Sequence, residues 1–275
     1  MTTDVWASYA TLDHTTQQRL AAVLETRGAD PQQQALRRSF LADVRLPAGA
    51  HVVDVGCGTG VLTRMLARWT GIATVVGVDV APLLLERART LAAGVPGVTF
   101  AQGDACALPF DDGTVDAVVF DSALSHIADT ARALTEAHRV LRPGGRLAVF
   151  DGDYATTTVA LGAHDPLQCC AEAMMASSVT HPWLMRRLGG LVRDCDFDVE
   201  RVRSHGFVET TDPAYMLTVV DRGADILRAR GQISAETAAA LQAEARSRAQ
   251  RGRFWRHIAY ASLVAQRGAA AAGRG

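Results

Sequence analysis

The stretch that decides the fold is VVDVGCGTG, from Val52 to Gly60, in which three glycines follow an apolar run that contains Asp54. A β-branched apolar run of this kind is typical of a strand that is buried on both faces. Glycines directly behind such a strand predict a tight turn whose backbone approaches a ligand at the carboxyl edge of a parallel sheet. The charge of that ligand depends on the residues around the turn.

Similar apolar runs recur along the next hundred residues. The expected strands are residues 51–56, 74–80, 98–104, 115–121 and 146–152. Segments 61–71 and 81–94 lie between the first three of them and have helical period. This alternation predicts right-handed crossovers and a doubly wound, parallel α/β sheet. Two later alternating runs, 199–211 and 254–266, predict an antiparallel closing pair.

The remaining segments predict helical additions to this sheet. We expect an N-terminal helical segment at 1–45 and a main domain at 46–267. Two helical insertions, at about 153–183 and about 212–252, are expected as cap elements. The glycine- and alanine-rich residues 268–275 are expected to form a flexible tail.

Composition argues against several classes of protein. The chain has 275 residues and 48 % apolar content, which is enough to bury the core of one large domain. Its 28 basic and 29 acidic residues give a net charge of −1, so a nucleic-acid or membrane partner is not expected. The sequence shows no long apolar run and no apolar leader, which predicts a cytoplasmic protein. Its five cysteines form no CxxC pair, which indicates reduced thiols and no metal site.

The glycine spacing argues against two kinds of phosphate-binding loop. A dinucleotide fingerprint requires a glycine at position 61, but Gly56, Gly58 and Gly60 alternate strictly and are followed by Val61. A P-loop requires a lysine followed by serine or threonine, and no such pair follows these glycines. Asp54 would repel a diphosphate and attract a cation. A nicotinamide-dependent oxidoreductase therefore remains an alternative, but it ranks below the two functions given at the end of this section.

Three further acids stand at the ends of the next three expected strands. They are Asp79, Asp104 and Asp121, and with Asp54 they all stand at carboxyl ends of expected parallel strands. An acid after the second strand can accept hydrogen bonds from both ribose hydroxyls, and one after the third can accept from an adenine amine. Acids near the glycine turn can pair with an ammonium group. This order of groups describes S-adenosylmethionine.

Four motifs resemble, in order and spacing, those of class I S-adenosylmethionine-dependent methyltransferases. The motifs are VVDVGCGTG, VVGVDV, QGDACALPFDDGTVDAVVF and EAHRVLRPGGRLAVFD. The resemblance is strongest to the ubiquinone/menaquinone-biosynthesis-like small-molecule group and covers residues 36–152 in detail. It implies a Rossmann-like, doubly wound seven-stranded sheet, mainly parallel, with an antiparallel last strand.

The resemblance also assigns residues to S-adenosylmethionine. It places the methionine portion on Asp54, Gly56, Gly58 and Thr59, the ribose on Asp79 and Val80, and the adenine on Gly103, Asp104 and Ala105. Asp121 and Ser122 would lie near the methionine portion as well.

Four residues are candidate catalytic groups. His126 follows the fourth expected strand closely and is an acid–base candidate, or else a helix cap. Asp151, Asp153 and Tyr154 stand at the expected exit of the fifth strand, on the ligand edge. A base is needed only if the acceptor must lose a proton.

We therefore expect a methyltransferase that acts on an O, N or C atom of a small-molecule acceptor, with no metal. The sequence is compatible with a homodimer. It does not identify the acceptor, because the residues that select the substrate lie in the cap. The alternative from another class is a methyltransferase-fold protein that binds the cofactor without methyl transfer. Such a protein would serve as a sensor, a partner subunit or a rearrangement catalyst.

Overall fold

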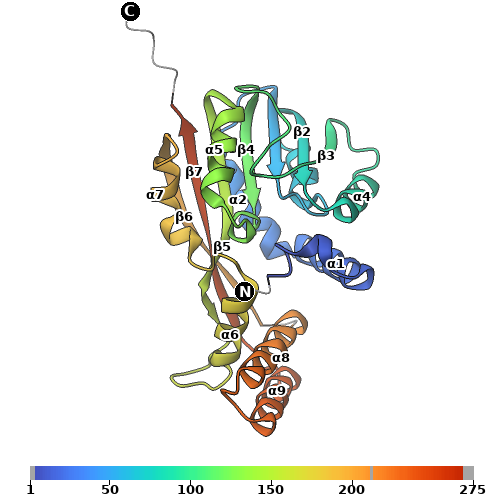
Figure 1. The fold of residues 1–275 in the computed structure, drawn as a ribbon, viewed down its shortest axis with the longest axis vertical. Helices are drawn as coiled ribbons and strands as arrows, with labels where there is room; N and C mark the ends of the chain where they lie inside the picture. Colours follow the sequence, from blue (N-terminus) through green and yellow to red (C-terminus); the bar gives the residue numbers. More distant parts are fainter. Residues whose placement is uncertain (1–3, 211–212, 269–275) are drawn as a thin grey trace, which may run out of the picture.

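A computed structural model describes residues 4–210 and 213–268, which form a seven-stranded sheet flanked by helices (Figure 1). The strand order is β3-β2-β1-β4-β5-β7-β6. The strands are β1 (Ala50–Val55), β2 (Ile72–Asp79), β3 (Val98–Gln102), β4 (Val115–Asp121), β5 (Leu141–Thr158), β6 (Phe197–Glu209) and β7 (Arg256–Arg267). The first five strands in this order, β3, β2, β1, β4 and β5, run parallel to one another, while β7 is antiparallel to both β5 and β6. The expected Rossmann-like sheet with an antiparallel last strand is confirmed.

Helices cover both faces of this sheet. They are α1 (His14–Ala29), α2 (Pro31–Val44), α3 (Val61–Leu66), α4 (Pro82–Leu91), α5 (Thr130–Val140), α6 (Gln168–Ser178), α7 (Leu184–Arg193), α8 (Ala214–Ala229) and α9 (Ala235–Gln250). Two short 3-10 turns, η1 (Tyr9–Thr11) and η2 (Leu124–His126), lie near the carboxyl edge of the sheet. The expected tail at 268–275 lies outside the described residues, apart from Gly268.

Each face of the sheet has its own apolar layer. Helices α5 and α7 cover Phe120 and Leu147 on one face. Helices α2 and α3 cover Val119 and Phe150 on the other. Residues with consecutive numbers are therefore buried on opposite faces, and β4 is buried at every position before Asp121. This two-sided burial is the reason why the central strands have continuous apolar runs.

Strand β5 is longer than the sequence indicates. It continues to Thr158, whereas the segment from 153 onward is expected to contain no strand. The physical reason is pairing with β7, which supplies hydrogen-bond partners as far as Thr158 opposite His257. The expected exit of this strand at 151–154 is thus wrong, because these residues lie inside the strand.

Helices α6, α8 and α9 form a separate apolar cluster at one end of the molecule (Figure 1). The cluster includes Leu167, Cys170, Met216, Val220 and Leu241. Ser234 caps α9: its hydroxyl accepts a hydrogen bond from the backbone nitrogen of Thr237 at 3.0 Å. Strands β5 to β7 extend towards these helices and connect them to the rest of the sheet.

The contact between α6 and α8 depends on Gly223. A Cβ at this position would stand 2.0 Å from the carbonyl oxygen of Cys170, so we expect Gly223→Ala to reduce the free energy of unfolding by about 1–3 kcal/mol. Gly190→Ala in α7 is the matched control, because a Cβ there meets nothing within 4 Å and should stabilise the helix by about 0.5–1 kcal/mol. Urea unfolding measures both changes, and a Gly223→Ala variant as stable as the wild type would contradict this helix contact.

Candidate functional site

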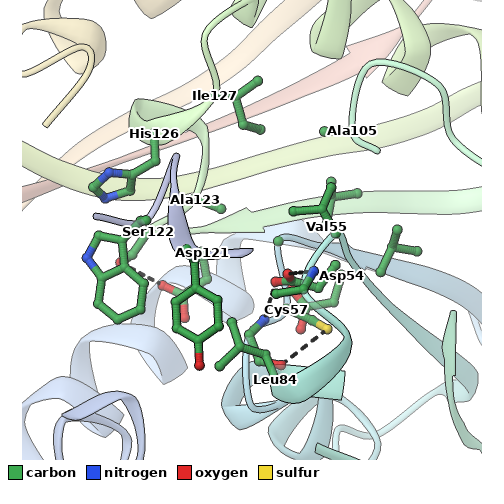
Figure 2. A pocket seen from close by; sticks show the side chains of 18 of the residues that line it. Asp54, Val55, Cys57, Leu84, Ala105, Asp121, Ser122, Ala123, His126 and Ile127 are labelled. Atoms are coloured by element: carbon green, nitrogen blue, oxygen red, sulfur yellow. Dashed lines mark hydrogen bonds between the residues drawn. The ribbon is translucent and has the colours of Figure 1, made fainter. Parts of the chain in front are cut away.

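A cavity of about 430 Å³ lies at the carboxyl ends of β1, β2 and β4 (Figure 2). The loops after these strands form one wall, and the N-terminal segment around Trp6 and Tyr9, together with α1, forms the other. All of the residues that the sequence assigns to the cofactor line this cavity. They are Asp54, Gly56, Gly58, Thr59, Asp79, Val80, Gly103, Asp104, Ala105, Asp121 and Ser122.

The glycine turn after β1 requires its glycines for conformation and for space. Gly56, Gly58 and Gly60 all have positive φ angles, of 72°, 54° and 78°. A Cβ on Gly56 would stand 2.5 Å from the Cβ of Ala123, and one on Gly60 would stand 2.9 Å from the ring of Phe100. The turn therefore lies against its neighbours with no room for side chains on these residues, and its backbone faces the cavity.

Asp79 is fixed between the end of β2 and this turn. Its carboxylate accepts hydrogen bonds from the backbone nitrogens of Gly58 and Ala81, each at 2.9 Å. Burial raises the pKa of Asp79, and these hydrogen bonds oppose the shift. The side chain is thus held in one orientation at the cavity wall, with capacity to accept further hydrogen bonds.

Asp54 is a buried acid with one oxygen left unpaired. Only 1 % of this residue is exposed, and its Oδ2 accepts a hydrogen bond from Thr63 Oγ1 at 2.6 Å. Its Oδ1 has no hydrogen-bond partner in the part of the chain that the structure describes. Burial raises the pKa of Asp54 to about 7, and repulsion from Asp121 and Asp79 acts in the same direction. A bound cation would remove most of this penalty.

Arg37 is a site residue that sequence reasoning missed. It belongs to α2, is 5 % exposed, and its Nε donates to Asp121 Oδ2 at 2.6 Å. Its Nη1 is buried and has no partner among residues 4–210 and 213–268. The available signal was its position in the buried stripe at 37, 40, 41 and 44, where a charged residue is unexpected. The cavity therefore offers an acid and a cation close to the glycine turn.

His126 lines the cavity on the side of Asp121 and Ser122 (Figure 2). Its Nδ1 lies 2.8 Å from Asp4 Oδ2, and that oxygen also accepts hydrogen bonds from the backbone and hydroxyl of Thr180 at 2.8 and 2.7 Å. Burial raises the pKa of Asp4 and the hydrogen bonds from His126 and Thr180 lower it, with a net lowering. An ionised Asp4 thus holds the His126 ring from its Nδ1 side.

The other three candidate catalytic residues do not line this cavity. Asp151 is fully buried and accepts hydrogen bonds from the backbone nitrogens of Ser125 and Gly152. Asp153 forms an ion pair with Arg186 at 2.9 Å, beside a second cavity of about 220 Å³. Tyr154 packs in the apolar layer under α2, and burial raises its pKa well above the usual value. These positions follow from the continuation of β5 and correct the expectation that residues 151–154 face the ligand edge.

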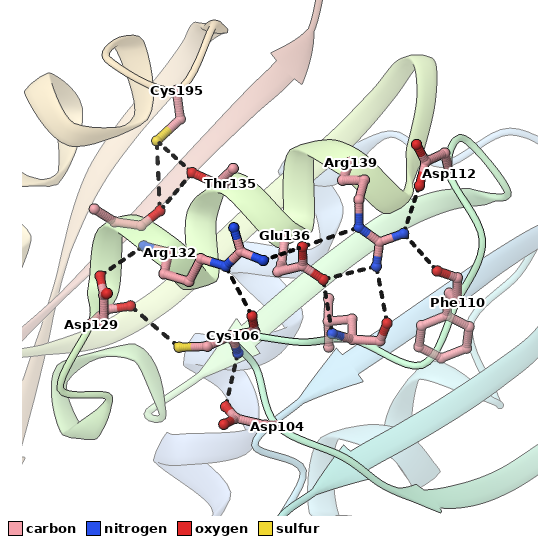
Figure 3. A network of polar contacts seen from close by, with 12 residues as sticks. Asp104, Cys106, Phe110, Asp112, Asp129, Arg132, Thr135, Glu136, Arg139 and Cys195 are labelled. Carbon is pink, nitrogen blue, oxygen red and sulfur yellow. Dashed lines mark hydrogen bonds and ion pairs between the residues drawn. The ribbon is translucent and has the colours of Figure 1, made fainter.

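A polar network fixes the loop after β3 against α5 (Figure 3). Glu136, which is 4 % exposed, accepts hydrogen bonds from Leu108 N at 2.9 Å and from Arg139 Nη2 at 2.8 Å. Hydrogen bonding from Arg139 lowers the pKa of Glu136. In the same loop, Asp104 Oδ1 accepts from Cys106 N at 2.8 Å. The loop that carries Gly103, Asp104 and Ala105 is therefore held in place by contacts within the protein.

Among the described residues, no group of three or more His, Cys, Asp or Glu side chains is arranged to hold a metal ion. Within the same part of the chain, no helix is both long enough and apolar enough to cross a membrane.

Comparison with known proteins gives consistent results. The model of a methyltransferase domain family matches residues 53–149. A demethylmenaquinone methyltransferase of Thermus thermophilus is 43 % identical over 135 residues, which cover 44 % of this chain and 61 % of the relative. A 2-phytyl-1,4-naphtoquinone methyltransferase of Thermosynechococcus vestitus is 40 % identical over 116 residues, covering 42 % of this chain and 52 % of the relative.

The fold is similar to that of solved structures over a longer part of the chain. The crystal structure of a Bacillus halodurans protein described as a candidate methyltransferase has a TM-score of 0.60 and 21 % identity, and the match covers 84 % of this chain and 98 % of that one. The chain spans about half the length of the curated relatives it matches. Motifs, fold and relatives agree: residues 53–149 are an S-adenosylmethionine-dependent methyltransferase domain, and over this part the chain is similar to the quinone methyltransferases named above.

Proposed function

We propose that this protein transfers the methyl group of S-adenosylmethionine to an O, N or C atom of a small-molecule acceptor. The observation that carries this proposal is the convergence of four strand-end acids on one cavity: Asp54, Asp79, Asp104 and Asp121. Binding of a diphosphate or a nucleoside triphosphate is disfavoured here, because the four acids would repel its negative charge. All five cysteines are free thiols, which supports the cytoplasm as the place of action.

The residues that line the cavity can supply a partner for each polar portion of the cofactor. The ribose hydroxyls would donate to Asp79, and the adenine would lie beside Asp104 and Ala105. The ammonium group would pair with the unpartnered Oδ1 of Asp54, and the carboxylate would pair with the unpartnered Nη1 of Arg37. One zwitterionic ligand would thus supply partners for two buried atoms that the protein leaves without any.

The bound cofactor supplies an electrophilic methyl group on a sulfonium, and the protein supplies alignment and exclusion of water. Trp6, Tyr9 and α1 cover the cavity, so that the acceptor would react in a closed space. His126 would remove a proton from an acceptor oxygen or nitrogen, because Asp4 binds its Nδ1 side and leaves Nε2 as the acceptor atom. Asp4 is then a positioning residue for this base.

Methyl transfer can be tested with methyl-labelled S-adenosylmethionine and the small-molecule fraction of a cell extract. The wild type should place label in organic-extractable product. Asp79→Ala should bind S-adenosylhomocysteine about 10–100-fold more weakly, since it loses two charge-assisted hydrogen bonds. Asp111→Ala, an exposed acid in a surface turn, is the matched control and should bind normally. Cofactor binding without any labelled product would favour the non-transferring alternative, and no binding at millimolar cofactor would contradict the proposal.

The raised pKa of Asp54 predicts a pH-dependent affinity for S-adenosylhomocysteine. In the free protein the carboxyl releases its proton only near pH 7, whereas the bound ammonium needs the ionised form. Calorimetric affinity should therefore fall by up to about tenfold for each pH unit below 7 and level off above it. Asp54→Asn should bind weakly with a flatter profile over the same range. A wild-type profile that is already flat between pH 5.5 and 8 would show that Asp54 does not pair with the ammonium.

The Asp4–His126 contact predicts the tautomer of the histidine. Nitrogen NMR of histidine-labelled protein should show His126 with its proton on Nδ1. Asp4→Ala should move this proton to Nε2 and reduce labelled transfer at least tenfold. Thr180→Val removes another hydrogen bond to the same carboxylate without touching the ring, and is the control for loss of the N-terminal anchor. Unchanged tautomer and transfer in Asp4→Ala would contradict the positioning role.

A further inference from the structure

Arg27 is a cation on the cavity wall that the proposed cofactor contacts leave unused. It belongs to α1, lines the cavity, and its Nη2 donates to the hydroxyl of Tyr260 at 3.1 Å. Within residues 4–210 and 213–268, no carboxylate forms an ion pair with it. A guanidinium in a largely apolar cavity is destabilising unless an anion compensates its charge.

The surroundings of Arg27 hold it in place and keep it charged. Tyr260 is 2 % exposed, and its hydroxyl also accepts a hydrogen bond from Gln33 Nε2 at 3.0 Å. Tyr260 raises the pKa of Arg27, burial opposes this shift, and Tyr215 and Tyr154 add to the increase. These neighbours are phenols and an amide, so the protein positions the guanidinium without neutralising it.

Arg27 lies at the end of the cavity away from the proposed adenine site. Its partner Tyr260 stands opposite Gly152 of β5, and β5 lies beyond β4 in the sheet. Asp79 and Asp104 follow β2 and β3, on the other side of β1. Arg37 already has Asp121 as a carboxylate partner and faces the proposed methionine site. Arg27 is therefore placed for the molecule that receives the methyl group.

We propose that the acceptor is a carboxylic acid and that Arg27 binds its carboxylate. This inference rests on the methyl transfer proposed above. A guanidinium pairs with a carboxylate through two parallel hydrogen bonds, so the contact would orient the acceptor as well as attract it. Trp6, Leu24 and Val61 line the same cavity and favour an acid with an aromatic or otherwise apolar body.

A matched pair of probes tests this proposal: 4-hydroxybenzoate and 4-hydroxybenzamide, which differ in the acid group. Ligand-observed NMR titrations would use protein saturated with S-adenosylhomocysteine. We expect the acid to bind the wild type about tenfold more tightly than the amide. Arg27→Met should abolish this preference, while Arg27→Lys should keep part of it. Arg19→Met removes an exposed arginine of the same helix and should keep all of it.

Equal affinities of the acid and the amide, or binding of neither, would overturn the proposal. A weaker affinity of Arg27→Met for S-adenosylhomocysteine would overturn it too, because Arg27 would then bind the cofactor carboxylate. In that case 5′-methylthioadenosine, which lacks the amino-acid portion, would bind the variant and the wild type equally. Failure of S-adenosylhomocysteine to bind the wild type would instead contradict the proposed function, and this inference with it.

Discussion

The structure depends on one electrostatic constraint, the burial of the Asp54 carboxylate at the end of the central strand. This residue is 1 % exposed, and one of its oxygens has no partner within the described residues. A buried acid with an unpaired oxygen is destabilising, and no cation of residues 4–210 or 213–268 lies at hydrogen-bond distance from it. The nearby Asp79 and Asp121 increase the cost. A ligand with a positive charge fits this position, and the glycine turn leaves space for it.

The charges around the cavity are arranged in order along the edge of the sheet. Acids follow β2 and β3, the acid of β1 lies at the glycine turn, and the acid of β4 is paired with Arg37. Beyond them, His126 follows β4, and Arg27 contacts Tyr260 of β7. The acidic half suits a nucleoside with an ammonium group, whereas the other half offers a base and a cation. A reaction between two bound small molecules fits this division better than a site for one ligand.

Much of this site could be predicted from the sequence, and the missing part has a physical reason. Strand-end acids and glycine spacing are local features. The residues that the sequence assigns to the cofactor, the first of them Asp54 and the last Ser122, could therefore be identified, and all of these assigned residues line one cavity. Arg37, Arg27 and Asp4 reach the site only because α1, α2 and the N-terminal segment dock over the edge of the sheet. That docking depends on packing between distant segments, which no local pattern encodes. Similarly, the length of β5 is set by β7, about a hundred residues later.

A crystal structure of the complex with S-adenosylhomocysteine tests the central claim most directly. The account predicts ribose hydroxyls on Asp79, adenine beside Asp104, the ammonium group on Asp54 and the carboxylate on Arg37. In that structure the Arg27 guanidinium should face an open part of the cavity. A ligand bound in the reverse direction, with its adenine near Asp121, or a ribose away from Asp79, would contradict the account.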